Sequence, residues 1–258
     1  MTIELSKEEF AYLLAAVEAT SLIGVEDPKL FPADARSRKT IYRKGREQLE
    51  ANGWLTPLED HQDEHELNAD LFHLTAAVAE ASYVLGTSVG ATKKGRRWLL
   101  HYLAGEHIIE LWLTQAKSYA FRVVPDRESL IERVAEVLEV DHSTNAVTLT
   151  LDEKTFKKIV NLASKGQEKQ ASELLETNGK VGSSIIQALS GKARAQISLV
   201  QASVGEIQVG RRASVYGTGK APWMVWREDE ESEQLNIAAC DADHLSQLLS
   251  KWIEQFPS

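Results

Sequence analysis

The chain has 258 residues, 43% of them hydrophobic and 26% charged, and its 15 glycines and 6 prolines are too few for a fibrous or low-complexity protein. This length predicts one large domain or two small ones, and either can bury a hydrophobic core. The formal net charge is −9, from 29 Lys and Arg against 38 Asp and Glu. Because a protein that binds a nucleic-acid duplex has to neutralise phosphates, this balance disfavours nucleic acid as the main partner.

Cysteine content and apolar runs exclude further classes of protein. The single cysteine, Cys240, excludes an internal disulfide and a cysteine-based zinc site. The start of the chain has no apolar segment of the kind that a secretory signal requires, and no apolar run reaches the roughly 20 residues of a membrane span. We therefore expect a cytoplasmic protein that contacts no membrane and carries no metal or cofactor.

An internal repeat divides the sequence into two related halves, 1–140 and 141–258. Residues 88–97 (SVGATKKGRR) and 203–212 (SVGEIQVGRR) are identical at six of ten positions, at an offset of 115. The flanking sequence continues the match at an offset of 114 to 115, in the pairs Tyr102/Tyr216, Trp112/Trp226, Phe121/Leu235, Val123/Ile237, Asp126/Asp241 and Leu130/Leu245. We interpret this match as a duplication whose two halves pack as one domain.

Each half predicts the same order of elements. In the first half, a strand at 2–5 leads into a helix that Ser6 caps, and in the second a strand at 147–151 leads into a helix that Asp152 caps. Four strands follow near 80–89, 96–104, 107–114 and 119–124, and near 194–204, 209–216, 222–228 and 234–240, and a helix closes each half at 126–139 and 241–255. Gly-containing turns between these strands favour hairpins. The pattern predicts an α+β fold, with one extended antiparallel sheet flanked by helices.

An insertion at about 32–57 distinguishes the first half. Ile41, Gly45 and Leu49 have helical spacing, and the helix ends at Asn52-Gly53. This helix and the strand after it resemble part of a winged helix. Six cations lie on the helix, at Arg36, Arg38, Lys39, Arg43, Lys44 and Arg46. They would suit a DNA-binding transcription regulator, which is the alternative function, but the acidic total favours a solvated face.

Enzyme motifs are incomplete in this sequence. His61, Glu64 and His65 fit the H-x-x-E-H pattern of a metal hydrolase, but the surrounding segment is polar and favours an acidic linker. Gly90 and Gly95 have the spacing of a P-loop, yet the Lys-Ser/Thr pair that should follow is missing. No histidine has a credible Ser or Cys nucleophile. We therefore expect a protein that is not an enzyme.

The layout of the chain resembles the EspG family, the secretion-associated chaperones of type VII (ESX) systems. The matching motifs are L-S-x-x-E-F from Leu5, R-x-x-L-x-x-x-G-W-L from Arg46, G-R-R-x-x-x-x-Y-x-A-G-E-x-I-I-E-L from Gly95, and D-x-x-x-L from Asp126. The resemblance spans nearly the full length and implies a quasi-two-fold fold. It also implies a cytoplasmic chaperone or adaptor that binds a helical protein client, of the PE–PPE or WxG kind.

In a duplicated protein, structural residues should recur and functional residues should differ between halves. Recurring residues, such as the Tyr102/Tyr216 and Trp112/Trp226 pairs, are assigned to the scaffold. The asymmetric candidates for partner binding are Lys220, Pro222, Trp223 and Met224, with the helical segment 167–190. Trp223 is then either a binding anchor or a core residue, and burial of its side chain would exclude the anchor. The acidic residues Glu228, Asp229 and Glu230 are predicted to steer a basic client.

Overall fold

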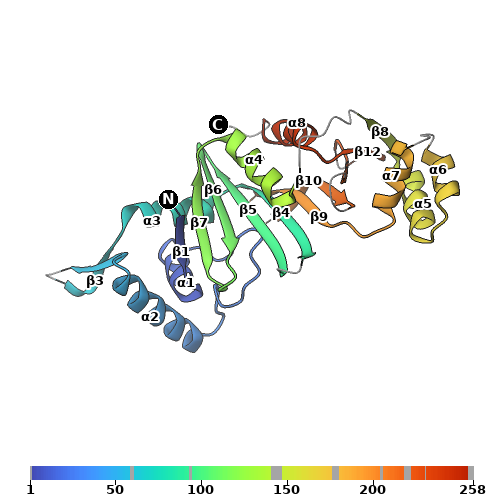
Figure 1. Cartoon of the computed structure of the whole chain (residues 1–258). Helices are drawn as coiled ribbons and strands as arrows, with labels where there is room; N and C mark the ends of the chain where they lie inside the picture. The colour runs from blue at the N-terminus through green and yellow to red at the C-terminus, as the bar shows by residue number, and fades with distance from the viewer. Residues whose placement is uncertain are drawn as a thin grey trace. The chain divides into compact units, whose positions relative to one another are not determined.

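The computed structural model describes residues 2–58, 61–92, 95–140, 147–175, 180–203, 206–217, 222–229 and 231–254. In these residues the fold is α+β, as the sequence predicts: ten strands form an antiparallel sheet flanked by helices, and two more strands form a separate hairpin (Figure 1). None of the helices in this part of the chain is long and apolar enough to cross a membrane.

The elements follow the predicted order in both halves. The first half contains β1 (Thr2–Leu5), α1 (Lys7–Ala16), α2 (Ala35–Ala51), β2 (Leu55–Leu58), β3 (His61–Leu67), α3 (Ala69–Glu80), β4 (Tyr83–Thr92), β5 (Gly95–Ala104), β6 (His107–Leu113), β7 (Tyr119–Val124) and α4 (Arg127–Leu138). The second contains β8 (Thr148–Asp152), α5 (Glu153–Ser164), α6 (Glu168–Leu175), α7 (Lys180–Leu189), β9 (Ala195–Ser203), β10 (Glu206–Tyr216), β11 (Trp223–Trp226), β12 (Gln234–Ala239) and α8 (Ala242–Ile253).

The order of strands in the sheet confirms the duplication. It runs β1-β7-β6-β5-β4-β9-β10-β11-β12-β8, so β4 to β7 with β1 have the same connectivity as β9 to β12 with β8. The strand register repeats as well, because Tyr102 lies opposite Ile109 and Tyr216 lies opposite Trp223. The predicted capping residues Ser6 and Asp152 are also confirmed, and Asp126 and Asp241 cap the closing helices in the same way.

Two details of the sequence match are wrong. Phe121 lies opposite Leu111 and Ile237 lies opposite Val225, so β7 and β12 correspond at an offset of 116 rather than 114. A shift of two residues keeps every side chain on its predicted face of the sheet. The hydrophobic pattern of the sequence therefore could not reveal the shift. The first residues of the repeated decamer also differ in place, since Ser88 lies within β4 whereas Ser203 ends β9.

The chain divides into two compact units that do not coincide with the sequence halves. Unit 1 contains Met1–Val84, Leu99–Pro125 and Gln201–Ile207, and unit 2 contains Leu85–Trp98, Asp126–Val200 and Gln208–Ser258. The predicted packing of the two halves as one domain stays a prediction.

In unit 1, α1 packs directly on the strands. The ring of Phe10 contacts the rings of Tyr119 and Phe121, with centroids 5.0 and 4.8 Å apart. The loop between α1 and α2, residues 17–34, covers the neighbouring sheet surface, and Tyr102 donates a hydrogen bond from its hydroxyl to the carbonyl of Ile23 over 2.8 Å. Asp27 fixes this loop, because it pairs with Lys7 at 2.5 Å and accepts from the hydroxyl of Tyr119 at 3.1 Å.

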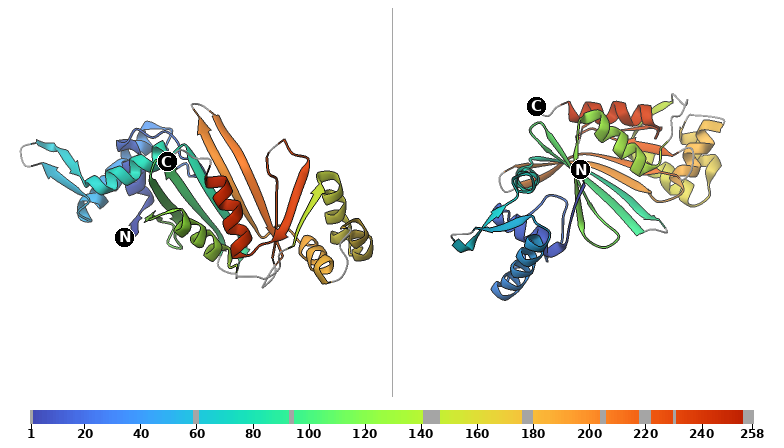
Figure 2. Two further views of the ribbon diagram at one scale, coloured as in Figure 1. Left: turned by 90° about the horizontal axis from the view of Figure 1, so that it is seen from above. Right: turned by 60° about the vertical axis from the view of Figure 1, so that its left-hand side comes forward.

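The insertion forms α2 and the β2–β3 hairpin. In both views of Figure 2 the hairpin, in light blue, projects away from the strands of unit 1. It is tied to α2 by His65, whose Nε2 lies 2.9 Å from Glu50. The H-x-x-E-H motif therefore lies on strand β3, where residues four apart are about 13 Å apart and cannot share a metal ion. Within the described residues, no group of three or more His, Cys, Asp or Glu could hold a metal.

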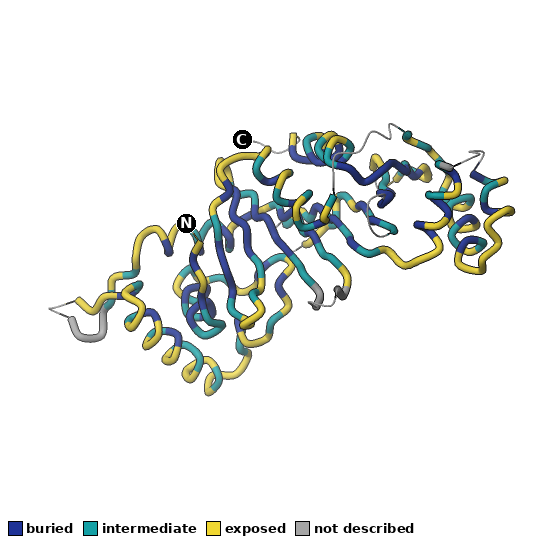
Figure 3. Tube along the Cα trace, in the orientation of Figure 1, coloured by how far each residue is buried: buried dark blue, intermediate teal, exposed yellow. Residues whose placement is uncertain are grey.

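In unit 2, helices α5, α6 and α7 cover one face of β11 and β12. Their apolar side chains form a cluster that includes Ile159, Leu175, Ile185 and Leu189, together with Trp223 of β11. Figure 3 shows buried positions alternating with exposed ones along these helices. The part of β11 and β12 that these helices cover is closed to a partner.

Candidate functional site

The predicted anchor at the start of β11 is wrong. Trp223 is 2% exposed, and its indole nitrogen donates to the hydroxyl of Ser184 over 3.1 Å. Met224 is fully buried and Pro222 is also buried. The physical reason is that α5, α6 and α7 pack over the start of β11, so the ring of Trp223 belongs to their apolar cluster and does not face a partner.

The other predicted site residues have different positions. Glu228 and Asp229 are exposed, and Glu228 forms an ion pair with Lys251. Lys220 and Glu230 lie outside the described residues. Within the segment 167–190, α6 and α7 pack their apolar sides into the cluster around Trp223. The predicted role of the acidic residues in steering a client stays a prediction.

A groove of about 560 Å³ opens beside α5 in unit 2. Its apolar surface comes from Phe156 of α5, Tyr216 of β10, Val225 and Trp226 of β11, and Leu235 of β12. The rings of Phe156 and Tyr216 are in edge contact, with centroids 6.4 Å apart. We call this site the α5 groove. Grooves that combine aromatic side chains with a few polar groups are typical binding sites.

The internal repeat shows why this groove is open. Leu100 and Leu111 form one pair across β5 and β6, and Ser214 and Val225 form the corresponding pair across β10 and β11. In unit 1 the α1–α2 loop presses on this surface, because a Cβ added to Gly24 would lie 3.0 Å from Leu100. In unit 2 only residues 165–167 join α5 to α6, so nothing equivalent to that loop follows α5.

Polar atoms of the α5 groove lack the partners that their counterparts have. The hydroxyl of Tyr102 donates to Ile23, whereas the hydroxyl of the equivalent Tyr216 makes no hydrogen bond within the described residues. Partial burial raises the pKa of Tyr216, so it remains a neutral donor. In the same part of the chain, the buried indole nitrogen of Trp226 also has no acceptor. The half-buried hydroxyl of Tyr216 is a donor on the groove, so it fits a ligand that presents a carbonyl oxygen.

Charged side chains surround the groove. Glu153, at the start of α5, pairs with Lys157 and with Arg227, each at 2.7 Å, and the hydrogen bond from Lys157 is the main cause of its lowered pKa. Arg212 and Asp229 also line the groove. The groove therefore combines an apolar floor with a mixed and mainly cationic rim.

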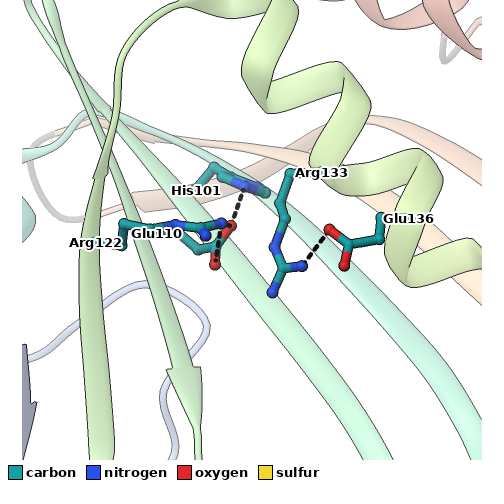
Figure 4. A network of polar contacts seen from close by, with 5 residues as sticks. All are labelled: His101, Glu110, Arg122, Arg133 and Glu136. Carbon is teal, nitrogen blue, oxygen red and sulfur yellow. Dashed lines mark hydrogen bonds and ion pairs between the residues drawn. The ribbon is translucent and has the colours of Figure 1, made fainter. Parts of the chain in front are cut away.

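A buried ionic cluster in unit 1 is the other concentration of titratable groups. Glu110 of β6 accepts two hydrogen bonds from Arg122 of β7, both at 3.0 Å, and lies 3.3 Å from Nε2 of His101 on β5 (Figure 4). Figure 4 also shows the pair between Arg133 and Glu136 along α4. Glu110 is held by a neighbouring arginine and directed at no groove that we identify in the described residues. We assign this cluster to structure rather than catalysis.

Two further motifs carry no chemistry. Gly90 and Gly95 lie on adjacent strands, β4 and β5, whereas a P-loop joins a strand to a helix. Cys240 is buried, and burial raises the pKa of its thiol to about 12, so it remains protonated at neutral pH and is a poor nucleophile.

The site residues that sequence reasoning missed are Phe156 and Tyr216. Tyr216 was assigned to the scaffold because Tyr102 recurs. Phe156 lies four residues after the cap Asp152, as Phe10 lies four residues after the cap Ser6, and it was not singled out. The available signal was the length of chain after each first helix, since the loop that covers Tyr102 has no counterpart in the second half. A recurring residue can thus be structural in one half and exposed to a partner in the other.

Comparisons with known proteins identify the fold. No family model and no curated protein matches the sequence. Among solved structures, the chain resembles the Mycobacterium tuberculosis type VII secretion system chaperone EspG5, in its complex with a PE25–PPE41 dimer. The TM-score is 0.67 at 11% sequence identity, over 100% of this chain and 97% of the other. The expected resemblance to EspG is therefore confirmed at the level of the fold.

Proposed function

We propose that this protein is a cytoplasmic chaperone or adaptor that holds a helical protein client, of the PE–PPE or WxG kind, in the α5 groove. The shared fold supports this role, because EspG5 is itself a chaperone and was solved with a PE25–PPE41 dimer. The fold alone does not determine a function, so the argument rests on the groove.

The observation that carries the proposal is the difference between the two halves. The chain's own loop, with Leu22 and Val25 buried and the carbonyl of Ile23 bonded to Tyr102, occupies in unit 1 the place that is open in unit 2. A client that fits the α5 groove would therefore present a short turn with one or two apolar side chains and a free backbone carbonyl. The loop between two helices of a helical protein has these features.

The rim explains how such a client would be oriented. Arg212 is exposed and makes no ion pair within the described residues, and Asp229 lies on the same groove. Complementary charges at a rim mainly change the association rate and the choice of partner. The client would therefore present acidic residues to the mainly cationic rim, and basic residues only where its apolar turn lies beside Asp229 and the neighbouring, exposed Glu228.

The experiment is a binding titration with purified heterodimers of defined sequence. The probes are PE25–PPE41 and any PE–PPE or WxG pair whose genes lie beside the gene of this protein, and binding is measured by isothermal titration calorimetry. We expect at least one pair to bind, and Phe156→Ala to weaken that binding by at least about 30-fold, the effect of about 2 kcal/mol that is usual for an anchor residue. Phe72→Ala, at an exposed aromatic of unit 1, is the matched control and should leave the affinity unchanged.

A conservative variant separately tests the hydroxyl of Tyr216, which is the hydrogen-bond donor in the groove. Tyr216→Phe removes only the hydroxyl and should weaken client binding about tenfold, because it deletes one hydrogen bond, while the melting temperature stays unchanged. The proposal fails if none of the heterodimers binds, or if both groove variants bind as tightly as the wild type.

A further inference from the structure

Four cations form a line along one side of α2. Arg36, Lys39, Arg43 and Arg46 are spaced by three or four residues, so they share one face of the helix over a length of about 15 Å. We call these residues the α2 cation row. The opposite face packs against α1, where a Cβ added to Gly45 would lie 2.1 Å from the carbonyl oxygen of Glu8. The row therefore faces away from the body of unit 1, and Figure 3 shows the exposed length of α2.

The first part of the row is not neutralised within the described residues. Arg43 pairs with Glu47 at 3.0 Å and Arg46 with Glu50 at 3.4 Å, but Arg36 and Lys39 have no ion pair. The chain as a whole has a net charge of −9, so a cationic helix runs against its composition. This local excess creates a positive potential on a protein that is otherwise acidic.

The N-terminal part of the row does not stabilise the helix. The first turn of α2 contains no acidic residue, and Arg36 lies in that turn. Cations at a helix N-terminus interact unfavourably with the helix dipole. The helices between the first helix and the first hairpin strand of the second half carry no such row. Helix α6 contains two Glu and one Lys, and α7 contains a single charged residue, Lys180. The duplicated fold therefore does not require these cations.

The residues near the α2 cation row indicate whether its partner is a protein or a nucleic acid. The segment 58–67, in and around the hairpin, contains five acidic residues and no Lys or Arg. The hairpin is tied to the C-terminal part of α2 through His65 and Glu50. A duplex carries a continuous line of phosphates on both sides of any contact, so it would be repelled by the acidic residues that lie on strand β3, Asp63, Glu64 and Glu66. A helix of limited length with one acidic face avoids this repulsion.

We propose that the α2 cation row binds an acidic helix of a protein partner, one that repeats Asp or Glu every three or four residues along one face. Such a helix would lie along α2 and place its carboxylates beside Arg36, Lys39 and Arg43. This surface belongs to unit 1 and is independent of the α5 groove in unit 2, so the inference stands whether or not the groove binds a client.

The test uses two synthetic helical peptides of identical composition. One carries four glutamates on a single face at the spacing of the row, and the other distributes them around the helix. We expect fluorescence anisotropy in about 50 mM salt to show the first peptide binding at least about tenfold more tightly, and this preference to weaken in about 200 mM salt. If both peptides bind equally, the proposed match of spacing is wrong.

Charge-reversed proteins locate the contact. The variant R36E/K39E/R43E should lose at least about tenfold in affinity for the first peptide, whereas K158E/K165E/K169E should not. The control makes the same change in net charge at three exposed lysines of unit 2. Equal losses in both variants would mean that the peptide responds only to overall charge. A duplex of about 20 base pairs, tested in parallel, would overturn the proposal if it bound more tightly than the peptide and lost binding in R36E/K39E/R43E.

A stability measurement separates binding from folding. R36E/K39E should melt no lower than the wild type, because acidic residues near a helix N-terminus interact favourably with its dipole. A clear fall in the melting temperature would show that the row stabilises α2 itself, and it would contradict the proposal.

Discussion

Glu110 is fully buried, and the two halves of the protein treat its position in opposite ways. In β5, β6 and β7 the three adjacent positions hold His101, Glu110 and Arg122. The same register positions in β10, β11 and β12 hold Val215, Met224 and Ala238, all of them fully buried. The fold is therefore compatible with either an ionic or an apolar set at this place. Buried ion pairs often contribute little net stability relative to apolar residues of similar volume.

This comparison predicts a non-additive set of variants. Arg122→Ala leaves the carboxylate of Glu110 buried without its main partner and should lower the free energy of unfolding by about 3–5 kcal/mol. The triple change H101V/E110M/R122A copies the second half and should cost clearly less than Arg122→Ala alone. Urea unfolding followed by circular dichroism measures both. A triple variant as unstable as the single one would show that the ionic cluster is required for folding of unit 1.

At the scale of elements, the contact between α1 and α2 depends on one glycine. The helices approach so closely at Gly45 that a Cβ there would lie 2.1 Å from the carbonyl oxygen of Glu8 and 2.9 Å from Cβ of Tyr12. Nearby, Glu9 accepts hydrogen bonds from the backbone of Ser6 and from the side chain of Asn52, which caps α2. Since these contacts fix both helices, α2 cannot shift to admit a methyl group without breaking them.

Gly45→Ala should therefore lower the free energy of unfolding by about 3 kcal/mol, although alanine is the better helix former. Gly191→Ala is the matched control, because the nearest atom to its added Cβ would be 3.9 Å away, an ordinary contact. Thermal unfolding of both variants measures the difference. If Gly45→Ala is as stable as the control, the two helices pack less closely than this structure shows.

The elements also show which features of the fold can be predicted from sequence. Helix starts were predictable, because Ser6, Asp126, Asp152 and Asp241 satisfy free amides within one turn of their own position. Strand β3 could not be predicted, because its sequence is nearly all polar. It pairs with β2, and its contact with α2 is made by His65 and Glu50. The two-residue shift between β7 and β12 was also hidden, since it changes neither face nor composition.

At the scale of the whole molecule, the α5 groove was beyond sequence analysis. It brings together Phe156 and Tyr216, which are 60 positions apart in the chain. The groove is open because the loop that covers this surface in the first half is missing in the second. No sequence motif marks a surface that the chain leaves uncovered. Trp223 was misassigned for the related reason that hydrophobic sequence does not distinguish a covered strand from an uncovered one.

The capping carboxylates give the molecule a predictable response to acid. The hydroxyl of Ser37 and that of Thr155 are the main causes of lowered pKa values at Asp34 and Asp152, and the backbone amide of Ser129 is the main cause at Asp126. At Asp27, burial acts to raise the pKa, but hydrogen bonds from Lys7 and from the backbone of Lys29 outweigh it and lower the value overall. These carboxylates hold fewer protons in the folded state than in the unfolded state near and below about pH 4.

Stability should therefore fall as pH drops through about 4, because unfolding then takes up protons. It should fall again above about pH 10, since burial raises the pKa values of Tyr102 and Tyr119 and their stabilising effect is lost as pH rises. Urea midpoints measured from acid to alkaline pH test both limbs. The variant D126N/D152N keeps both caps, because asparagine also caps helices, but removes two titrating groups. It should be nearly as stable as the wild type at neutral pH and show a shallower acid limb, whereas an unchanged limb would mean that other carboxylates dominate acid unfolding.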